Sequence, residues 1–296
     1  MTVIDAHAHW YRHDIIWPEE NWKFIVTSFS AISGGKYDEE GIKNLFWDPD
    51  GSTLIRTMDE AGIDKTVILP VDFGILYQQE PPIDFWGMNK LYSELAKKYP
   101  GRIFTYFGVD PRREKAAYHF EKAIEEWGNI KGLKIYPPCG FSPGDTVCDA
   151  LYEVCEKRDL PVLTHGCESA YSETQYGGPE FLRGMLKRHP HLRIVNAHAG
   201  WNQFFEGAVD LLKDYENCYA DISGWQTFPD EQIMQQLEVI DQKAGSLDKL
   251  MFGTDAPNFD VLVTTKTWVD RVKALKLSDD VKQKLLSDTA AKVHKI

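Results

Sequence analysis

The chain has 296 residues, a net charge of −12 and 43% hydrophobic residues. Its length exceeds the roughly 250 residues of a typical (β/α)8 barrel and allows one large domain. The acidic balance argues against nucleic acid as a partner, because phosphate binding requires clustered cations. No apolar run approaches the roughly 20 residues that span a bilayer, and the first predicted strand follows Met1-Thr2 directly. We therefore expect no membrane contact, no signal peptide and a cytoplasmic location.

The five cysteines indicate a reducing compartment. They are odd in number and show no Cys-x-x-Cys spacing, so neither a disulfide framework nor a zinc knuckle is predicted. Cys148 and Cys155 fall seven residues apart on one apolar helix face, which predicts core packing. Cys167 follows a candidate metal ligand by two residues, and it is expected to line the site rather than to act as a nucleophile.

Short apolar runs predict eight strands. Most runs are apolar throughout, as expected for parallel strands covered on both faces, and amphipathic helical patterns separate them. This alternation predicts a parallel sheet, and eight units favour a closed (β/α)8 TIM barrel, one domain over 1–296, rather than an open sheet. No Gly-x-Gly-x-x-Gly follows the first strand, which argues against a dinucleotide fold. The predicted strands are 3–9, 65–72, 102–110, 130–137, 161–166, 193–200, 218–224 and 249–257.

Two segments depart from a minimal barrel. Residues 10–51, before a predicted helix at 52–61, form an insertion rich in Trp and Phe. A long loop after a barrel strand emerges on the catalytic face, so the insertion is a candidate lid or substrate wall. A small satellite core or an oligomer contact explains the same residues nearly as well. Residues 278–296 predict a closing helix with Ser278 as its N-cap.

Polar residues end several of the predicted strands, where barrel chemistry is located. His7 and His9 leave the first strand on the same face, because residues i and i+2 do so. His165, His198 and Asp255 end the apolar runs of three later strands. Imidazoles with one carboxylate suit one catalytic divalent metal, zinc first and manganese or iron as alternatives. Asp255 could bind the metal and accept a proton, and His198 could act as a base or polarise the substrate.

The remaining histidines have an ordinary interpretation. They lie in predicted loops or on helix faces, where exposure to solvent accounts for them. The pair in His189-Pro190-His191 precedes a strand and would lie on the wrong face of a barrel. These residues are His13, His119, His189, His191 and His294.

These motifs resemble the amidohydrolase superfamily, in the amidohydrolase-related subgroup that includes aminocarboxymuconate-semialdehyde decarboxylase and aromatic acid decarboxylases. The resemblance implies that His7, His9, His165 and Asp255 bind one metal and that His198 is the catalytic histidine beside it. It spans the whole chain and is specific for the superfamily, much less so for a reaction. The matching segments are 4–9, 132–137, 164–166, 189–200, 252–257 and 289–292.

Lys134, on the fourth predicted strand, has two possible roles. Some superfamily members carboxylate a lysine at this place to bridge two metals, whereas a single metal is more usual in this subgroup. We favour a free Lys134 that anchors a carboxylate or enolate of a small-molecule substrate. Tyr136 and Trp201 are expected to bind the same substrate as a planar group. A homodimer is a family-level expectation only.

Two reactions fit these residues. The first is hydrolysis of a small cyclic or carboxylated substrate by metal-activated water, which we favour by a narrow margin. The second is non-oxidative decarboxylation of an aromatic or enol-type acid, which needs cations to hold the carboxylate. No arginine lies in or directly after the strand-end motifs, although Arg12 or Arg56 could reach the site. A non-catalytic barrel that binds a metal or ligand is a minor third alternative.

Overall fold

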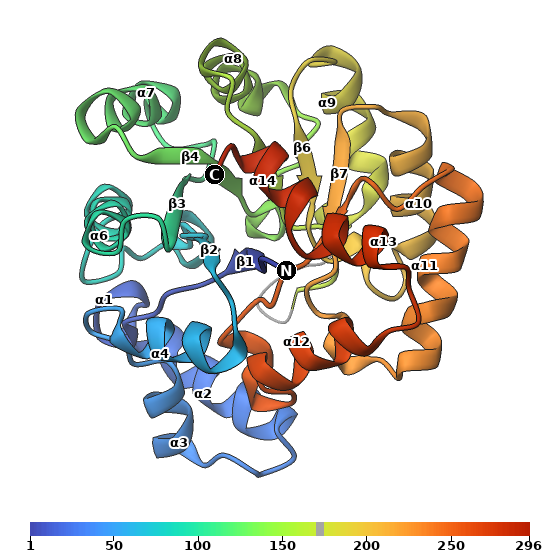
Figure 1. Ribbon diagram of the computed structural model, residues 1–296. Coiled ribbons are helices and arrows are strands. Elements are labelled where there is room, and N and C mark those ends of the chain that lie inside the picture. Colours follow the sequence, from blue (N-terminus) through green and yellow to red (C-terminus); the bar gives the residue numbers. More distant parts are fainter. Residues whose placement is uncertain (170–174) are drawn as a thin grey trace.

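The computed structural model describes residues 1–169 and 175–296. Eight parallel strands follow one another in sequence order around a single sheet, and helices surround it (Figure 1). The predicted TIM barrel is therefore confirmed, with strands shorter than the apolar runs suggested. The strands are β1 (Ile4–Ala8), β2 (Lys65–Ile68), β3 (Ile103–Gly108), β4 (Ile130–Ile135), β5 (Val162–Thr164), β6 (Ile194–Asn196), β7 (Cys218–Asp221) and β8 (Leu250–Met251).

Amphipathic helices cover the outer face of the sheet and bury their apolar sides against it. The predicted helix at 52–61 is α4, and Gly62 ends it in the left-handed conformation that glycine adopts without strain. The helices of the ring are α4 (Ser52–Ala61), α5 (Gly74–Tyr77), α6 (Phe85–Lys98), α7 (Ala116–Trp127), α8 (Asp149–Arg158), α9 (Leu182–Arg188), α10 (Phe205–Asp214), α11 (Asp230–Ala244) and α12 (Thr265–Ala274). None of the helices among the described residues is long and apolar enough to cross a membrane.

The seam between the first and last strands is closed by separate contacts, because β8 has only two residues. The backbone N–H of Ala6 donates to Phe252 at 3.0 Å, and that of Asp255 donates to His7 at 2.7 Å. The buried carboxylate of Asp5 accepts from both the backbone and the hydroxyl of Thr254, at 2.9 and 2.6 Å. These bonds tie the segment that carries Asp255 to the strand that carries His7.

The closing segment at 278–296 fills the bottom of the barrel. It consists of α13 (Asp279–Gln283), a π-helical turn (Lys284–Asp288) and α14 (Thr289–His294), and the predicted N-cap, Ser278, accepts from the N–H of Val281. Figure 1 shows α14 lying across the ring of strands. Ala290 and Val293 belong to the inner core together with strand residues such as Ile4 and Val67. Two histidine interpretations were wrong: His294 and His189 are buried.

The insertion at 10–51 packs against the edge of the barrel. It contains α1 (His13–Ile16), α2 (Glu19–Ile32) and α3 (Glu39–Leu45), and these helices lie beside α4, at the edge of the barrel (Figure 1). Its aromatic rings cluster around Phe46, which stacks on Tyr11 at 5.2 Å and meets Phe29 at 5.0 Å, and this aromatic cluster is continuous with the main hydrophobic core. The same α2 also supplies a wall of the main cavity, described below.

Candidate metal centre

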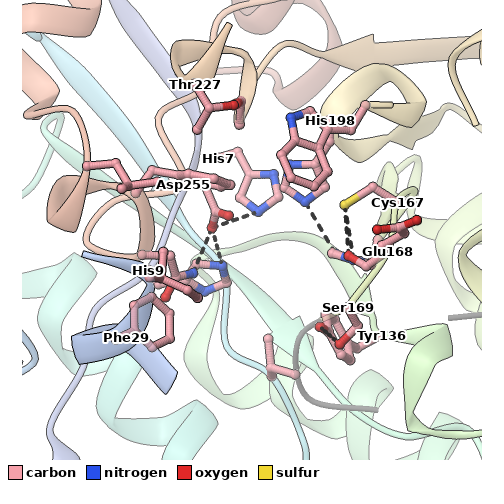
Figure 2. A pocket seen from close by; sticks show the side chains of 18 of the residues that line it. His7, His9, Phe29, Tyr136, Cys167, Glu168, Ser169, His198, Thr227 and Asp255 are labelled. Atoms are coloured by element: carbon pink, nitrogen blue, oxygen red, sulfur yellow. Dashed lines mark hydrogen bonds and ion pairs between the residues drawn. The ribbon is translucent and has the colours of Figure 1, made fainter. Parts of the chain in front are cut away.

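A cavity of about 390 Å³ opens at the carboxyl ends of the strands, where active sites of this fold lie. Polar and aromatic side chains from many strands meet in it, and Figure 2 shows several of them. All the residues that the sequence singled out for a site lie in its wall. They are His7, His9, Lys134, Tyr136, His165, His198, Trp201 and Asp255.

Three of the four expected metal ligands meet at one point. Oδ1 of Asp255 lies 3.0 Å from Nε2 of His9 and 3.6 Å from Nε2 of His7, and Figure 2 shows the two rings pointing at the carboxylate. His7, His9 and Asp255 each offer one ligand atom within 4.8 Å of the others, and all three are buried. The i, i+2 spacing on β1 therefore places both imidazoles on the inner face, as predicted.

The second nitrogen of each β1 histidine is held by an acceptor. Nδ1 of His7 lies 3.0 Å from Oδ2 of Asp221, and Nδ1 of His9 lies 2.7 Å from the carbonyl oxygen of Leu69. A carbonyl or carboxylate oxygen only accepts, so Nδ1 carries the proton and Nε2 keeps its lone pair. This arrangement orients histidine ligands in many metal sites. Both Nε2 atoms are thus available toward Asp255.

Asp255 is held as an anion. Burial by itself would raise the pKa of this carboxyl, but the contact with His9 and the fields of His7 and His198 outweigh burial and keep the pKa well below its usual range. Nε2 of His9 faces this carboxylate at 3.0 Å, and a cation between the two atoms, either a proton or a metal ion, would satisfy both. The donor set therefore fits a divalent metal ion.

His165 does not join the other three expected ligands. Its Nδ1 lies 3.2 Å from Nε2 of His198, and its Nε2 lies 3.1 Å from the carbonyl oxygen of Glu168. Nδ1 of His198 lies 3.1 Å from the carbonyl oxygen of Ser223. Both carbonyl oxygens only accept, so in neutral rings the protons lie on Nε2 of His165 and Nδ1 of His198. The other two nitrogens then face each other with lone pairs, and a cation between them would be favourable. With Cys167, they form a second group of possible ligands.

Both rings of this pair resist protonation. Burial, followed by the field of the neighbouring His7, lowers the pKa of His198 to about 4. Burial followed by the field of His198 places the pKa of His165 well below its usual range. At neutral pH both imidazoles are therefore neutral and have a lone pair to offer.

The backbone at the site is strained at two chemically important residues. His198 has φ 63° and Asp255 has φ 53°, in the left-handed region that residues other than glycine rarely adopt. Such strain persists only where the surroundings enforce it, and it concentrates at functional sites. For His198 the surroundings include an N–H bond to Asp221 at 3.1 Å and an acceptor bond from the Trp225 indole at 2.9 Å.

Lys134 is a buried cation in the cavity wall. Burial lowers its pKa to about 8, although the charges of Asp255 and Asp221 oppose the shift. Among the described residues that line the cavity, Lys134 is the only lysine or arginine. It is therefore the one fixed positive charge that these residues offer to a substrate.

Tyr136 and Trp201 lie in the wall at different places. The ring of Tyr136 lies 4.6 Å from that of His165, and its hydroxyl contacts Oγ of Ser169 at 2.8 Å. Trp201 stacks on Phe228 with ring centroids 6.0 Å apart. Tyr136 thus supports His165 directly, while Trp201 extends the aromatic surface of the cavity.

Several residues of the site escaped the sequence analysis. Asp221 ends β7, just as the other ligand candidates end their strands. A polar residue at the end of an apolar run, here Cys218-Tyr219-Ala220-Asp221, could have identified it from the sequence. Ser223 contacts both His198, at 2.9 Å, and the same carboxylate. Burial would raise the pKa of Asp221, but its interaction and hydrogen bond with His7 hold this pKa well below the usual range. Asp221 thus supports two histidines at once.

The described lining of the cavity contains no arginine. Arg112 and Arg113 follow β3 by a few residues, so arginines do occur near a strand end. Both are committed elsewhere: Arg113 pairs with Asp72 at 2.8 Å, and Arg112 pairs with Asp110 at 2.6 Å. Arg12 pairs with Asp14 at 3.0 Å. Arg56 is exposed on α4. None of these four arginines lines the cavity.

The amidohydrolase family model matches residues 4–296, and the chain therefore belongs to the amidohydrolase family. This confirms the superfamily resemblance that the strand-end motifs suggested. A curated dihydroorotase from Picosynechococcus sp. is 28% identical over 138 residues, which is 40% of this chain and 38% of that protein. The chain thus matches well under half of that relative's length.

Solved structures of similar fold cover nearly the whole chain. An uncharacterised TIM-barrel protein from Bordetella bronchiseptica is 18% identical, with a TM-score of 0.75 over 99% of this chain and 98% of that one. The 5-carboxyvanillate decarboxylase from Novosphingobium aromaticivorans, in complex with manganese and 4-hydroxy-3-methoxy-5-nitrobenzoic acid, is 17% identical, with a TM-score of 0.71 over 100% and 96%. A 2,6-dihydroxybenzoate decarboxylase from Rhizobium is 15% identical, with a TM-score of 0.68 over 100% and 99%. At these identities the likeness shows the fold.

Proposed function

We propose that this protein is a metal-dependent carboxy-lyase that releases CO2 from an aromatic or enol-type carboxylic acid. One observation carries the proposal: the cavity combines a donor set that fits a divalent metal with the buried ammonium of Lys134, the only lysine or arginine among its described lining residues. The sequence favoured hydrolysis by a narrow margin. We reverse that order because the ammonium of Lys134 is buried in the same cavity as the candidate ligands, where it can hold a substrate carboxylate, and because decarboxylases are among the structures of similar fold.

His7, His9 and Asp255 would hold the metal. His165, which faces His198, is the predicted fourth ligand. A bound divalent ion would supply positive charge that stabilises negative oxygens of the substrate. The nitrogen and carboxylate donors suit zinc and also manganese. Manganese is the ion in the complex of 5-carboxyvanillate decarboxylase. Manganese and zinc are therefore the two metals to compare.

Lys134 would position the acid. In a buried setting its ammonium attracts a carboxylate more strongly than it would in water, because the local dielectric is low. Aromatic side chains nearby, including Tyr136 and Phe73, whose rings lie 5.5 Å apart, offer faces to a planar substrate. The substrate carboxylate would lie toward Lys134 and the ring between these aromatic walls.

The reaction requires a proton for carbon. When the carbon–carboxyl bond breaks, CO2 leaves and the electron pair stays on the ring carbon, which must then take up a proton. A bound divalent ion would lower the pKa of a substrate hydroxyl, and the anionic Asp255 could then accept that proton and return it to the carbon. His198 lies beside this carboxylate and is neutral, which leaves it as a hydrogen-bonding partner of substrate oxygen.

Hydrolysis is the second candidate. The same anionic Asp255 could accept a proton from an attacking water, and the partial match to a dihydroorotase favours ring hydrolysis. This reaction gives Lys134 a carboxylate-binding role as well, so the two candidates share every residue and differ in the bond that breaks.

One experiment separates the candidates. The protein, loaded with manganese or zinc, is incubated with hydroxylated and methoxylated benzoic acids and, separately, with lactones and cyclic amides. CO2 release and acid release are measured in the same samples, with Asp255→Asn and the exposed Asp241→Asn as test and control variants. A decarboxylase releases CO2 in proportion to product and, in D2O, places one deuterium on the carbon that lost the carboxyl. Acid release without CO2 would overturn the carboxy-lyase in favour of the hydrolase.

A further inference from the structure

The mouth of the cavity has a different chemistry from its floor. The floor carries the titratable side chains of the strand ends, whereas Phe29 and Ile32 of α2 and Leu262 after the 3₁₀ helix Asn258–Val261 lie in the outer wall. Ile32 and Leu262 are 45% and 42% exposed although both line the cavity, which places them at its opening. An apolar group bound there would cover surface that is now in contact with water, and this is favourable.

We propose that Phe29, Ile32 and Leu262 form an apolar subsite, and that the substrates are aromatic acids with one carboxylate and a hydrophobic substituent. The proposal rests on the function proposed above, since it concerns the same cavity. In this proposal the insertion helps to select the substrate, a role that the strand-end residues do not have. The barrel would provide the chemistry, and α2 with the segment after β8 would provide the selectivity.

Charge at the cavity supports a monoacid. Lys134 is the only lysine or arginine among the described lining residues, and it lies buried among the polar groups of the floor. The exposed Glu168 also lines the cavity and adds a negative charge to the wall. A second carboxylate on the substrate, held at the mouth, would meet apolar side chains and Glu168 without a cation. Desolvating an unpaired charge in this way is strongly unfavourable.

The apolar wall is held in place by the aromatic cluster around Phe46. Phe29 packs on Phe46, and Trp22 of the same helix stacks on Trp17 at 5.4 Å and on His13 at 4.8 Å. Figure 2 shows Phe29 on the His9 side of the cavity, away from Tyr136 and Ser169. Helix α2 is thus anchored through its aromatic face, and its C-terminal turn presents Ile32 to the mouth as a fixed surface.

The test compares matched acids on the manganese-loaded protein. The probes are 2-hydroxybenzoate and its derivatives with either a tert-butyl group or a second carboxylate at ring position 4 or 5. Dissociation constants are measured by titration calorimetry. At one of the two positions we expect the tert-butyl acid to bind about 10-fold more tightly than the parent, because an open mouth would bury the equivalent of about one to two of its carbons, at roughly a factor of four for each buried CH2. The dicarboxylate at that position should bind more weakly than the parent.

Two variants at the mouth test the apolar subsite directly. Ile32→Lys and Leu262→Lys should each remove the preference for the tert-butyl acid and strengthen binding of the dicarboxylate. Val147→Lys is the control, because Val147 is 43% exposed but lies outside the cavity wall. Thermal melting of all three variants verifies folding.

The outcomes separate this inference from the proposed function. Equal binding of tert-butyl and dicarboxylate acids by the wild type, or an unchanged preference in Ile32→Lys, would overturn the subsite. Tight, selective binding without CO2 release would retain the subsite and remove the carboxy-lyase. CO2 release from all the acids without selectivity would remove the subsite and retain the carboxy-lyase. Failure of every acid to bind would remove both.

Discussion

Oδ2 of Asp221 lies 3.0 Å from Nδ1 of His7, and the two residues are 214 positions apart in the chain. The bond runs from the end of β7 to the first strand and fixes which nitrogen of His7 faces Asp255. Asp221 also accepts the backbone N–H of His198 at 3.1 Å. A single carboxylate therefore orients one candidate ligand and the strained turn that carries another functional residue.

Replacement of this carboxylate should weaken metal binding. In Asp221→Asn the amide can still contact His7 but no longer stabilises its Nδ1 proton by charge, so affinity for manganese or zinc should fall about 10- to 100-fold. Calorimetric metal titration measures the change. Asp48→Asn is a matched control, since Asp48 is also buried but binds the backbone amides at the start of α4. Equal affinities for the two variants would contradict the role of Asp221.

Lys134 should give substrate binding a pH limit. Its pKa is lowered to about 8 mainly by burial, so the ammonium is present below this pH and is lost as the pH rises through it. A nearby metal lowers the pKa further. Affinity of the metal-loaded protein for 2-hydroxybenzoate should therefore fall with an onset at or below about pH 8. Lys134→Arg should remove the fall, because arginine stays charged in this range.

A neutral residue at position 134 provides the complementary measurement. Lys134→Met should bind the same acid weakly at every pH, without the fall above pH 8. Arg12→Lys, outside the cavity wall, should follow the wild-type profile. A wild-type profile in Lys134→Met would exclude the lysine as the carboxylate anchor.

The sequence could predict the barrel and the position of its chemistry, but not how the side chains pair. Parallel strands end on one face, so apolar runs that end in His7, His165 or Asp255 suffice to gather these residues in one cavity. Which of them meet depends on the backbone beyond the strands. The positive φ values of His198 and Asp255 turn these side chains, and no local pattern of residues announces such a turn.

The closing helix shows a second limit of the same kind. A polar residue near the end of a chain is usually exposed to solvent, and the sequence predicts this for His294. The helix instead inserts into the barrel floor, where the hydroxyl of Tyr106 contacts Nδ1 of His294. Burial of the last turn depends on a tertiary contact that sequence periodicity does not show.

Acid should destabilise the fold through His294. Burial lowers its pKa to about 3, so the unfolded chain takes up a proton near pH 6.5 while the folded protein does not. The contribution to stability is complete above pH 6.5 and is lost progressively as the pH falls toward 3. The free energy of unfolding of His294→Gln, measured with urea between pH 7 and about 4, should fall less steeply than that of the wild type. The exposed His191→Gln should match the wild-type slope.

Gly108 should tolerate no side chain. A Cβ at this position of β3 would lie 2.0 Å from the backbone oxygen of Pro70, and a backbone atom cannot move aside as a flexible side chain can. Gly108→Ala should therefore lower the free energy of unfolding by at least about 1–3 kcal/mol. Gly184→Ala in α9 is the control, because its nearest neighbour is the movable end of Arg188 at 3.3 Å. Similar urea midpoints for both variants would contradict this account.

The candidate metal centre lies on the seam of the barrel. His7 and His9 come from the first strand and Asp255 from the segment after the last one, and β8 contributes only two residues to the sheet. An ion bound by all three would link the first strand to the segment after the last strand, where the short β8 provides little strand pairing. It could bind only after almost the entire chain has folded, and by mass action it would favour the closed ring over any opened form. Loss of the ion would then loosen the barrel where its two ends meet.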